Sequence, residues 1–442
     1  MIHKLIRGIA KYLSPHPFVE ILSIHLGHTL IEAGAFYVHK PLAVRWRKPF
    51  ANKWLVEKLK ENLRFPKFNN WINREMENET VLGKKFIQMF RSMSDQYWLL
   101  NLGFNGISEI KKEYIHFTQK EIAEAEKFMQ KYKLSKGRYV CFCIRDESYY
   151  QKYKKDLAEI DPNADYAFRN ANINQYISSA KHLASKGYKV LRMGFSATKK
   201  SSSGNSRSVF INPSEDKNYR PWIEAYLFKN CAFCVGMMTG GTLYASFFSR
   251  PILWADVFWR GTPVGKKLDM IIPKLIYRKE GKARHEILNL MEIRKMGPPK
   301  DNNWRYFTRL GLKVKNCSSN EITDGVKDML VFLKTGRYFQ AKEEKVLHKK
   351  FSALHYSIAK RSLVVPTRLA PSWAKKYSRL ISGTEIAQKT SQKIYNEFWQ
   401  RYEKDEHMFE TMFKAKKTNN LFRMKKETPF QSLHKASPSI YQ

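Results

Sequence analysis

The chain has 442 residues, of which 43% are hydrophobic and 14% aromatic. This composition excludes a disordered protein and allows two or three domains around a large core. A formal net charge of +39 predicts an anionic partner such as nucleic acid, an anionic membrane face or a phosphorylated substrate, although solvated lysine faces explain it as well.

Residues 1–17 carry an amphipathic pattern ahead of the first strand. Their apolar positions can share one helical face among basic side chains: Ile2, Leu5, Ile6 and Ile9. The pattern is typical of a short helix on an anionic bilayer, but a packed N-terminal helix explains it as well. The apolar segment 18–38 contains acidic residues and histidines, so it is a poor transmembrane span. We expect a cytoplasmic protein, with peripheral attachment to the inner face of the plasma membrane as an option.

Residues 18–135 are expected to form a first Rossmann-like domain. The segment 18–25 is strand-like and leads into Gly27 and His28. His28 would lie at the mouth of a cleft, although such a histidine more often caps a helix or bonds to the backbone.

Between residues 40 and 117 the sequence pattern is less clear, and three prolines punctuate it. Helices are predicted at 54–63 and 81–93. A basic-aromatic cluster at 45–48 could contact a phosphate or a sugar face, although a solvated loop is the more common outcome. Thr118 and Glu121 fit a capping box that starts a bridge helix between two domains.

The stretch 137–194 predicts a strand–helix–strand unit at the start of a second domain, residues 136–340. The runs 137–145 and 187–193 are strand-like, because apolar or β-favouring residues lie between a glycine and a polar break. Between them, 172–186 has apolar residues at helical spacing.

Arginines mark the ends of this unit. Arg145 and Arg192 follow the two strands, and Arg169 opens the helix. Ligands of open α/β sheets bind at the carboxyl ends of the strands. Three guanidinium groups at that edge suggest a ligand with phosphate or carboxylate groups.

A glycine-rich turn, 239–242, follows a third strand at 231–235 and opens a helix through Phe248. Its backbone N–H groups and the helix dipole would favour a phosphate. The turn is neither a Walker A motif nor a Rossmann GxGxxG motif, so a tight turn without a ligand is an equal alternative. Further strands are expected at 251–255, which ends at Asp256, and at 271–274.

The remaining elements are expected to be helices. One is predicted at 282–291 and one at 322–333, the latter capped by Ser319 or Asn320. Residues 341–442 are expected to form a basic tail, with helices near 341–360 and 384–414 and a disordered end.

The five cysteines are an odd number in a large chain, so no disulfide framework is predicted and a reducing compartment fits. A zinc site would have to pair Cys141 and Cys143 with Cys231 and Cys234. Both pairs lie in strand-like runs where buried cysteines are ordinary core residues. We therefore expect no metal and no cofactor.

The ordered run of motifs resembles a group of bacterial glycosyltransferases encoded with surface-polysaccharide genes. The resemblance covers roughly residues 20–335. The order of the motifs along the chain is more specific to this family than any single motif. The matching pieces are Gly27-His28, Phe117-Thr118, Val140-Cys141 through Arg145-Asp146-Glu147-Ser148-Tyr149, Phe168-Arg169-Asn170, Gly187-Tyr188 through Arg192-Met193-Gly194, Thr239-Gly240-Gly241 through Pro251, Pro273-Lys274 and the Asn316 to Asp324 run.

The resemblance implies an α/β protein of the GT-B type, in which two facing Rossmann-like domains hold a nucleotide-sugar between them without a metal. Residues 18–135 would be the acceptor domain and residues 136–340 the donor domain. Basic side chains and backbone amides would hold the donor: Arg145, Arg169, Asn170, Arg192, Gly194, Thr239, Gly240, Gly241 and Thr242. Asp256 would contact the ribose or sugar of the donor, or else be structural.

Inverting transfer also needs a base for the acceptor hydroxyl. The candidates are Asp146, Glu147 and His28. Asp146 follows Arg145 directly, so a salt bridge or loop cap is its alternative role. The acceptor would be a surface glycan or a lipid-linked sugar, and the sugar, the nucleotide and the stereochemistry stay open.

Two other classes of function explain parts of the sequence. The net charge of +39 also fits a non-enzymatic protein that binds nucleic acid or another polyanion, but no recognised nucleic-acid motif is present. Another α/β enzyme on phosphorylated sugars is the second alternative, against which stand the missing Walker A and GxGxxG motifs. We favour a glycosyltransferase and expect no specific nucleic-acid partner.

Overall fold

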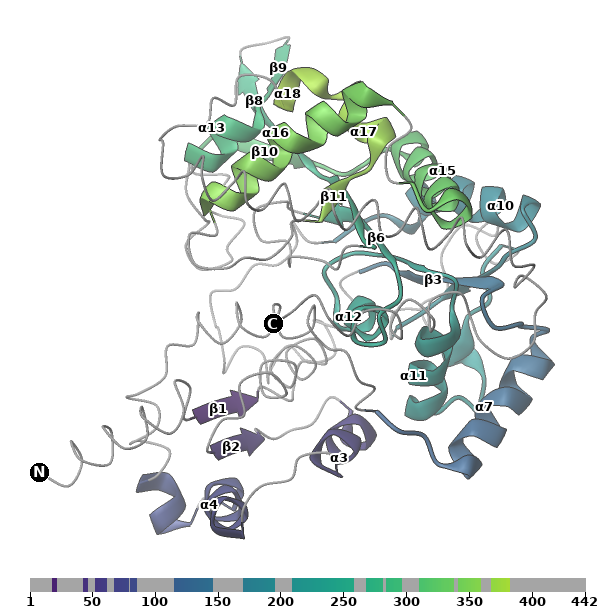
Figure 1. The fold of residues 1–442 in the computed structure, drawn as a ribbon, viewed down its shortest axis with the longest axis vertical. Coiled ribbons are helices and arrows are strands. Elements are labelled where there is room, and N and C mark those ends of the chain that lie inside the picture. The colour runs from purple at the N-terminus through teal and green to yellow at the C-terminus, as the bar shows by residue number, and fades with distance from the viewer. Residues whose placement is uncertain are drawn as a thin grey trace, which may run out of the picture. The chain divides into compact units, whose positions relative to one another are not determined.

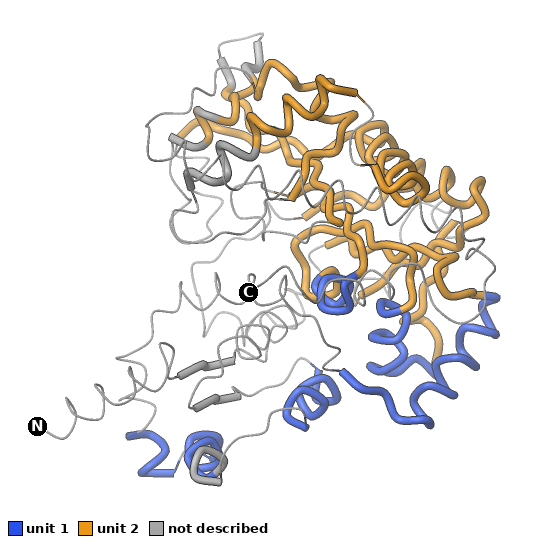
Figure 2. Tube along the Cα trace, in the orientation of Figure 1, with its two compact units in different colours: residues 1–133, 218–229, 243–249 blue, residues 134–217, 230–242, 250–442 orange. Residues whose placement is uncertain are grey.

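The computed structural model describes residues 18–21, 43–46, 52–61, 67–78, 80–85, 115–145, 170–194, 209–257, 268–280, 284–295, 310–337, 341–358 and 367–381. The chain divides into two compact units (Figure 2). Unit 1 comprises residues 1–133, 218–229 and 243–249, and unit 2 comprises residues 134–217, 230–242 and 250–442. The predicted domain boundaries at 17/18, 135/136 and 340/341 stay predictions.

Unit 2 is built on a six-stranded sheet in which every pairing is parallel (Figure 1). Its strands are β3 (Tyr139–Cys143), β4 (Lys189–Arg192), β5 (Cys234–Gly236), β6 (Ile252–Val257), β7 (Met270–Pro273) and β11 (Arg368–Leu369). Strands β3, β5, β6 and β7 are buried along their whole length. Parallel sheets bury both faces, so their strands are continuous apolar runs, and this is why the strands predicted for residues 136–340 are confirmed.

The strand order across the sheet is β11-β7-β6-β5-β3-β4. The first strand in the chain, β3, therefore has the second strand on one side and the third on the other. This is the doubly wound order 2-1-3-4-5, extended by one edge strand. Its topological switch point lies between β3 and β5.

The helix predicted at 172–186 is present but opens as a 3-10 turn, η2 (Ile173–Tyr176), before α10 (Ile177–Ser185). Helix α15 (Ser319–Thr335) packs against α10 and against β7. At Gly325 in α15, a Cβ atom would come within 2.3 Å of Ile272 Cδ1, so glycine permits the close approach of helix and strand.

A second, antiparallel sheet in unit 2 was not predicted from the sequence. Its strands are β8 (Leu275–Glu280), β9 (Arg284–Ile287) and β10 (Leu312–Lys315), in the order β10-β8-β9.

The helix predicted at 282–291 is therefore wrong. Helix α13 (Leu290–Lys295) begins later, because Asn289 and Glu292 exchange capping hydrogen bonds at 2.9 and 2.8 Å. The segment before Asn289 pairs with β8 instead.

A separate basic C-terminal extension is not confirmed. Helices α16 (Lys342–Ile358), α17 (Pro371–Lys376) and α18 (Ser378–Ile381) belong to unit 2, and β11 is the edge strand of its main sheet. Ser372 donates from its N–H and its hydroxyl to Asp328 of α15, at 2.9 and 2.6 Å. The predicted helix at 384–414 lies outside the described residues.

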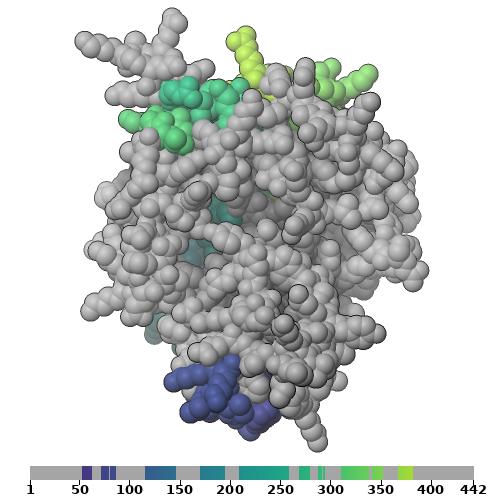
Figure 3. Space-filling view, turned by 90° about the vertical axis from the view of Figure 1, so that its left-hand side faces the viewer, coloured from purple at the N-terminus to yellow at the C-terminus, as the bar shows by residue number. Residues whose placement is uncertain are grey.

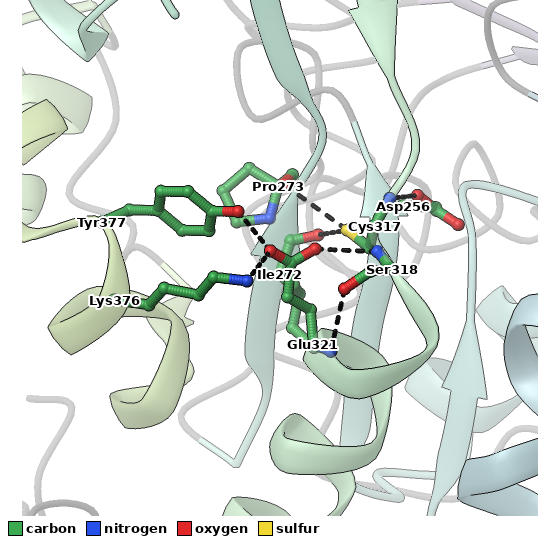
Figure 4. A network of polar contacts seen from close by, with 8 residues as sticks. All are labelled: Asp256, Ile272, Pro273, Cys317, Ser318, Glu321, Lys376 and Tyr377. Atoms are coloured by element: carbon green, nitrogen blue, oxygen red, sulfur yellow. Dashed lines mark hydrogen bonds and ion pairs between the residues drawn. The ribbon is translucent and has the colours of Figure 1, made fainter.

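The first turn of α15 is closed by side chains from within the unit (Figure 4). Its cap is Ser318, so the expected cap at Ser319 or Asn320 is wrong. Ser318 and Glu321 form a capping box, and the Glu321 carboxylate also accepts hydrogen bonds from Lys376 Nζ at 2.6 Å and from the Tyr377 hydroxyl. Burial alone would raise the pKa of Glu321, but these hydrogen bonds hold it below its ordinary value of 4.5.

Unit 1 contains the parallel strands β1 (Phe18–Ile21) and β2 (Ala43–Trp46). Its helices are α3 (Lys53–Glu61), α4 (Lys67–Glu77), α7 (Gln119–Lys131) and most of α11 (Pro221–Asn230) and α12 (Gly240–Phe247). Strand β2 replaces the loop expected at 45–48. The capping box of α7 is confirmed, because Thr118 and Glu121 exchange hydrogen bonds at 3.2 and 2.7 Å.

An aromatic cluster and polar contacts hold the helices of unit 1 together. Phe117 contacts Trp54, Tyr226 and Phe248, with ring centroids 5.7, 5.4 and 6.2 Å apart. Trp54 Nε1 donates to Glu121 of α7 at 2.6 Å. Helices α3, α7 and α11 therefore form one packed group.

Segments of the antiparallel sheet and of the C-terminal helices reach the surface, in teal to yellow-green in Figure 3. Among the residues that the structure describes, no helix has both the length and the apolar character that crossing a bilayer would require. Residues 1–17 lie outside this set, so their membrane role stays a prediction.

Replacing Glu321 with Gln should destabilise the protein. The change leaves donors from Ser318, Lys376 and Tyr377 without a carboxylate, at an expected cost of about 1–3 kcal/mol at pH 7. A lowered carboxyl pKa stabilises the fold above its ordinary value and loses that contribution as the pH falls through the lowered pKa. Urea unfolding curves of wild type and Glu321→Gln should therefore differ at pH 7 and converge in acid.

The matched control is Asp324→Asn in the same helix. Asp324 pairs with Lys327 on the exposed surface, so its loss should cost about 0.5 kcal/mol or less. Equal losses for the two variants would contradict the role assigned to Glu321.

Candidate functional site

The candidate site lies at the carboxyl edge of the main sheet of unit 2. The ends of β3 and β5, on either side of the switch point, are tied together there. The Met237 N–H donates to the Cys143 carbonyl at 3.1 Å, and the Arg145 N–H donates to Met237 Sδ at 3.4 Å. Ligands of doubly wound sheets bind outside this edge. The sequence predicted three arginines at the same edge.

The turn after β5 is shaped by its two threonines. The Thr239 hydroxyl accepts from the Thr242 N–H at 3.3 Å, and the Thr242 hydroxyl donates to the Met237 carbonyl at 2.7 Å. Thr242 is fully buried, so its side chain holds the turn. A Cβ at Gly236 would come within 2.4 Å of Thr242 Oγ1, so this contact requires a glycine at the end of β5.

The glycines of this turn present unpaired donors. The N–H groups of Gly240 and Gly241 begin α12, and neither has a hydrogen-bond partner within the described parts of the chain. The first N–H groups of a helix have no partner inside the helix and lie at the positive end of its dipole. An anion can therefore bind here through backbone donors.

Two of the predicted arginines lie at this edge. Arg145 lies two residues beyond β3, and Arg192 is the last residue of β4 with only 8% of its surface exposed. Gly194 adopts a φ of +98°, which turns the chain just beyond β4. Four predicted site residues lie outside the described residues: His28, Asp146, Glu147 and Arg169.

Lys274 is a member of the site that the sequence analysis did not assign. It follows β7, is 2% exposed, and its ammonium donates to the Asn170 carbonyl at 2.9 Å and to Asn316 Oδ1 at 2.6 Å. Burial lowers the pKa of Lys274, Asp256 opposes this, and the charge of Arg145 lowers the pKa further. The sequence pattern could have identified Lys274, because this basic residue follows a buried strand, as Arg145 does.

Asp256, in β6, binds the segments that lie next to the carboxyl edge of the sheet. Its carboxylate is 2% exposed and accepts hydrogen bonds from the Tyr176 hydroxyl at 2.9 Å and from the Cys317 N–H (Figure 4). The residue lies at a β-bulge in β6 with a φ of +55°, a backbone conformation that aspartate tolerates better than most residues. Both oxygens are thus engaged with η2 and with the start of α15. The expected contact of Asp256 with the donor stays a prediction.

Burial raises the pKa of Asp256, although Lys274 and the hydrogen bonds from Cys317 and Tyr176 oppose the rise. The same burial, together with the neighbouring carboxylate, raises the pKa of the Tyr176 hydroxyl well above its ordinary value. Tyr176 therefore stays a protonated hydroxyl that donates to Asp256.

The cysteines of unit 2 pack in the core. Cys141, Cys143, Cys231 and Cys234 are buried thiols, and the Sγ atoms of Cys143 and Cys234 lie 3.9 Å apart on neighbouring strands. In the described ranges, no three side chains of His, Cys, Asp or Glu gather as metal ligands would.

No protein-family model matches the chain, and no curated protein sequence matches it significantly. Among solved structures, the glycosyl transferase family 9 protein from Veillonella parvula is similar over 58% of this chain and 85% of its own, with 9% identity and a TM-score of 0.37. The ADP-heptose LPS heptosyltransferase II of E. coli is similar over 61% of this chain and 92% of its own, with 13% identity and a TM-score of 0.34. Because both TM-scores are low, the function has to be argued from the residues of this chain.

The close contact at Gly236 gives a test of the turn. Gly236→Ala should cost about 1–3 kcal/mol of unfolding free energy, because the new methyl group overlaps Thr242 in a packed site. Thr242→Ala removes the atoms in the way, so the double variant should lose less than the sum of the single variants. Urea unfolding of the four proteins measures this coupling, and strict additivity would contradict the contact.

Proposed function

We propose that the protein is a glycosyltransferase that moves a sugar from a nucleotide-sugar donor to a glycan or lipid-linked acceptor. One observation carries the proposal. Unpaired backbone donors at Gly240 and Gly241 lie at the same sheet edge as the basic side chains of Arg145 and Lys274. A diphosphate needs this combination of fixed positive charge and backbone N–H groups.

The chemistry follows from the charge that develops in transfer. The bond from the anomeric carbon to the phosphate oxygen breaks, and the leaving nucleotide gains negative charge. Cations and helix dipoles that are already in place stabilise this charge without reorganising. We assign this work to the start of α12 and to Arg145, Arg169 and Arg192.

The new bond forms between the anomeric carbon and an acceptor hydroxyl, whose proton must go to a base if the configuration inverts. We assign the base to Asp146, Glu147 or His28. The first two follow Arg145 in the chain, so they would lie close to the donor phosphates.

We propose a GT-B enzyme with residues 18–135 as the acceptor domain and residues 136–340 as the donor domain, acting without a metal ion. The donor site would use fixed cations where other transferases use a metal. A net charge of +39 and the amphipathic residues 1–17 support work on cell-envelope glycans at an anionic membrane face.

Replacing Arg145 tests the proposal most directly. Thermal shift and calorimetry with UDP-, GDP-, CMP- and dTDP-sugars should show stabilisation of the wild type by at least one donor. Arg145→Ala should weaken that binding about tenfold or more, because a charge-assisted hydrogen bond to phosphate is lost. Arg192→Ala should also lower transferase activity.

The matched control is Arg138→Ala. Arg138 precedes β3, so it lies at the opposite end of the same strand, where its guanidinium packs 5.1 Å from the Tyr188 ring centroid. Its loss should leave donor binding within about twofold of wild type. No shift with any donor, combined with tight binding of random RNA at moderate salt, would instead support a polyanion-binding protein.

A further inference from the structure

We propose that the carboxamide of Asn170 reads a hydroxyl group of the donor, and that Lys274 is the positioning residue that holds Asn170 in place for this. The inference rests on the proposed function. It assigns a specificity role to a side chain at the edge of the sheet rather than to the cations that hold phosphate.

The main chain at Asn170 is fixed from two directions. Its carbonyl accepts from Lys274 Nζ at 2.9 Å and from Asn316 Nδ2 at 3.4 Å. The next residue, Ala171, donates its N–H to the Arg145 carbonyl at 3.0 Å. Asn170 is thus tied to the ends of β3 and β7 and to the loop before α15, which restricts where its side chain can point.

Lys274 and Asn316, which hold the Asn170 carbonyl and together are called the clamp, are bonded to each other. Lys274 is 2% exposed and donates a 2.6 Å hydrogen bond to Asn316 Oδ1. Its own N–H donates to the Val257 carbonyl at 2.9 Å. Burial lowers the pKa of Lys274 and the negative charge of Asp256 opposes this, while the ammonium form donates both hydrogen bonds at once.

The side chain of Asn170 is polar and lacks a partner. Its Oδ1 atom is buried and accepts no hydrogen bond from any residue that the structure describes. A buried acceptor without a partner is costly, so proteins pair such atoms with water or a ligand. The main chain of Asn170 is held by hydrogen bonds, while its Oδ1 atom requires a partner that the described residues do not supply, as expected of a group that recognises a ligand.

The position decides the chemical class of that ligand group. Ala171, the residue after Asn170, donates to the Arg145 carbonyl, so phosphates of a bound donor would lie near Asn170, at the positive charge of Arg145. A neutral carboxamide adds little to phosphate binding, but it can accept from or donate to a hydroxyl. The hydroxyl belongs to the donor, either on its ribose or on its transferred sugar.

Calorimetric titration can test this with defined ligands. We would titrate wild type and Asn170→Ala with UDP, GDP, ADP and CDP, with their 2′- and 3′-deoxy forms, and with UDP-glucose, GDP-mannose, ADP-glucose and CDP-glucose. Wild type should discriminate by about tenfold in favour of the ligand that carries the recognised hydroxyl. Asn170→Ala should lower this ratio to about twofold or less.

The ligand series separates the two sources of the hydroxyl. If Asn170→Ala loses the preference for the ribo form of a nucleotide over its deoxy form, the contact is with the ribose. If Asn170→Ala instead loses the preference for the nucleotide-sugar over the free nucleoside diphosphate, the contact is with the transferred sugar. If wild type binds a diphosphate but shows neither ratio, or if Asn170→Ala keeps the ratio, the inference is overturned while the proposed function stands. If wild type binds none of these ligands, the proposed function itself fails.

Two variants test the positioning role of Lys274. Lys274→Met removes the hydrogen bonds to the Asn170 carbonyl and to Asn316 Oδ1. It should lower the discrimination ratio as Asn170→Ala does. Asn316→Ala keeps the buried ammonium and its hydrogen bond to the Asn170 carbonyl, so it is the milder change and should lower the ratio partly.

The control is Lys376→Met, which also removes a lysine with a 2.6 Å hydrogen bond in unit 2, but to Glu321 at the start of α15. It should lower thermal stability and leave the discrimination ratio unchanged. An unchanged ratio in Asn316→Ala and Lys274→Met, or an equal loss in Lys376→Met, would overturn the positioning role.

Discussion

The buried carboxylate of Asp256 is the interaction on which the edge of the main sheet depends. A buried charge is costly unless it is paired and hydrogen-bonded. Asp256 meets this condition through Tyr176, the Cys317 N–H and the nearby ammonium of Lys274. Because its hydrogen-bond partners come from η2 and from the loop before α15, one carboxylate fixes two segments that reach the site from different parts of the chain.

Polar groups at this edge divide into two kinds by what they already bind. Asp256, Thr242 and Lys274 spend their hydrogen bonds on the protein, and each is at most 2% exposed. The N–H groups of Gly240 and Gly241 and the Oδ1 of Asn170 have no partner in the described part of the molecule. A site that is held in position by satisfied groups can present unsatisfied ones without rearranging when a ligand binds.

The sequence predicted the buried parallel strands well and the polar edge incompletely. Strands such as β3 and β6 are apolar on both faces, so each is visible from its own residues. Strands β8 and β9 were missed, because the sequence before Asn289 also fits a helix and only pairing with β8 decides against it. The contacts of Asp256 with Tyr176 and Cys317 join residues 80 and 61 positions apart, and no local pattern predicts such a pairing.

A comparison of the N-termini of α12 and α15 at this edge shows why the anion site is assigned to α12. At α15 the Glu321 carboxylate already occupies the first turn and is itself held by Lys376 and Tyr377. A ligand phosphate there would have to displace a paired carboxylate and face its charge. At α12 the cap is the neutral hydroxyl of Thr239, which leaves the donors of the two glycines unpaired among the described residues. The positive end of this dipole is thus open to an anion, on the same edge as Arg145.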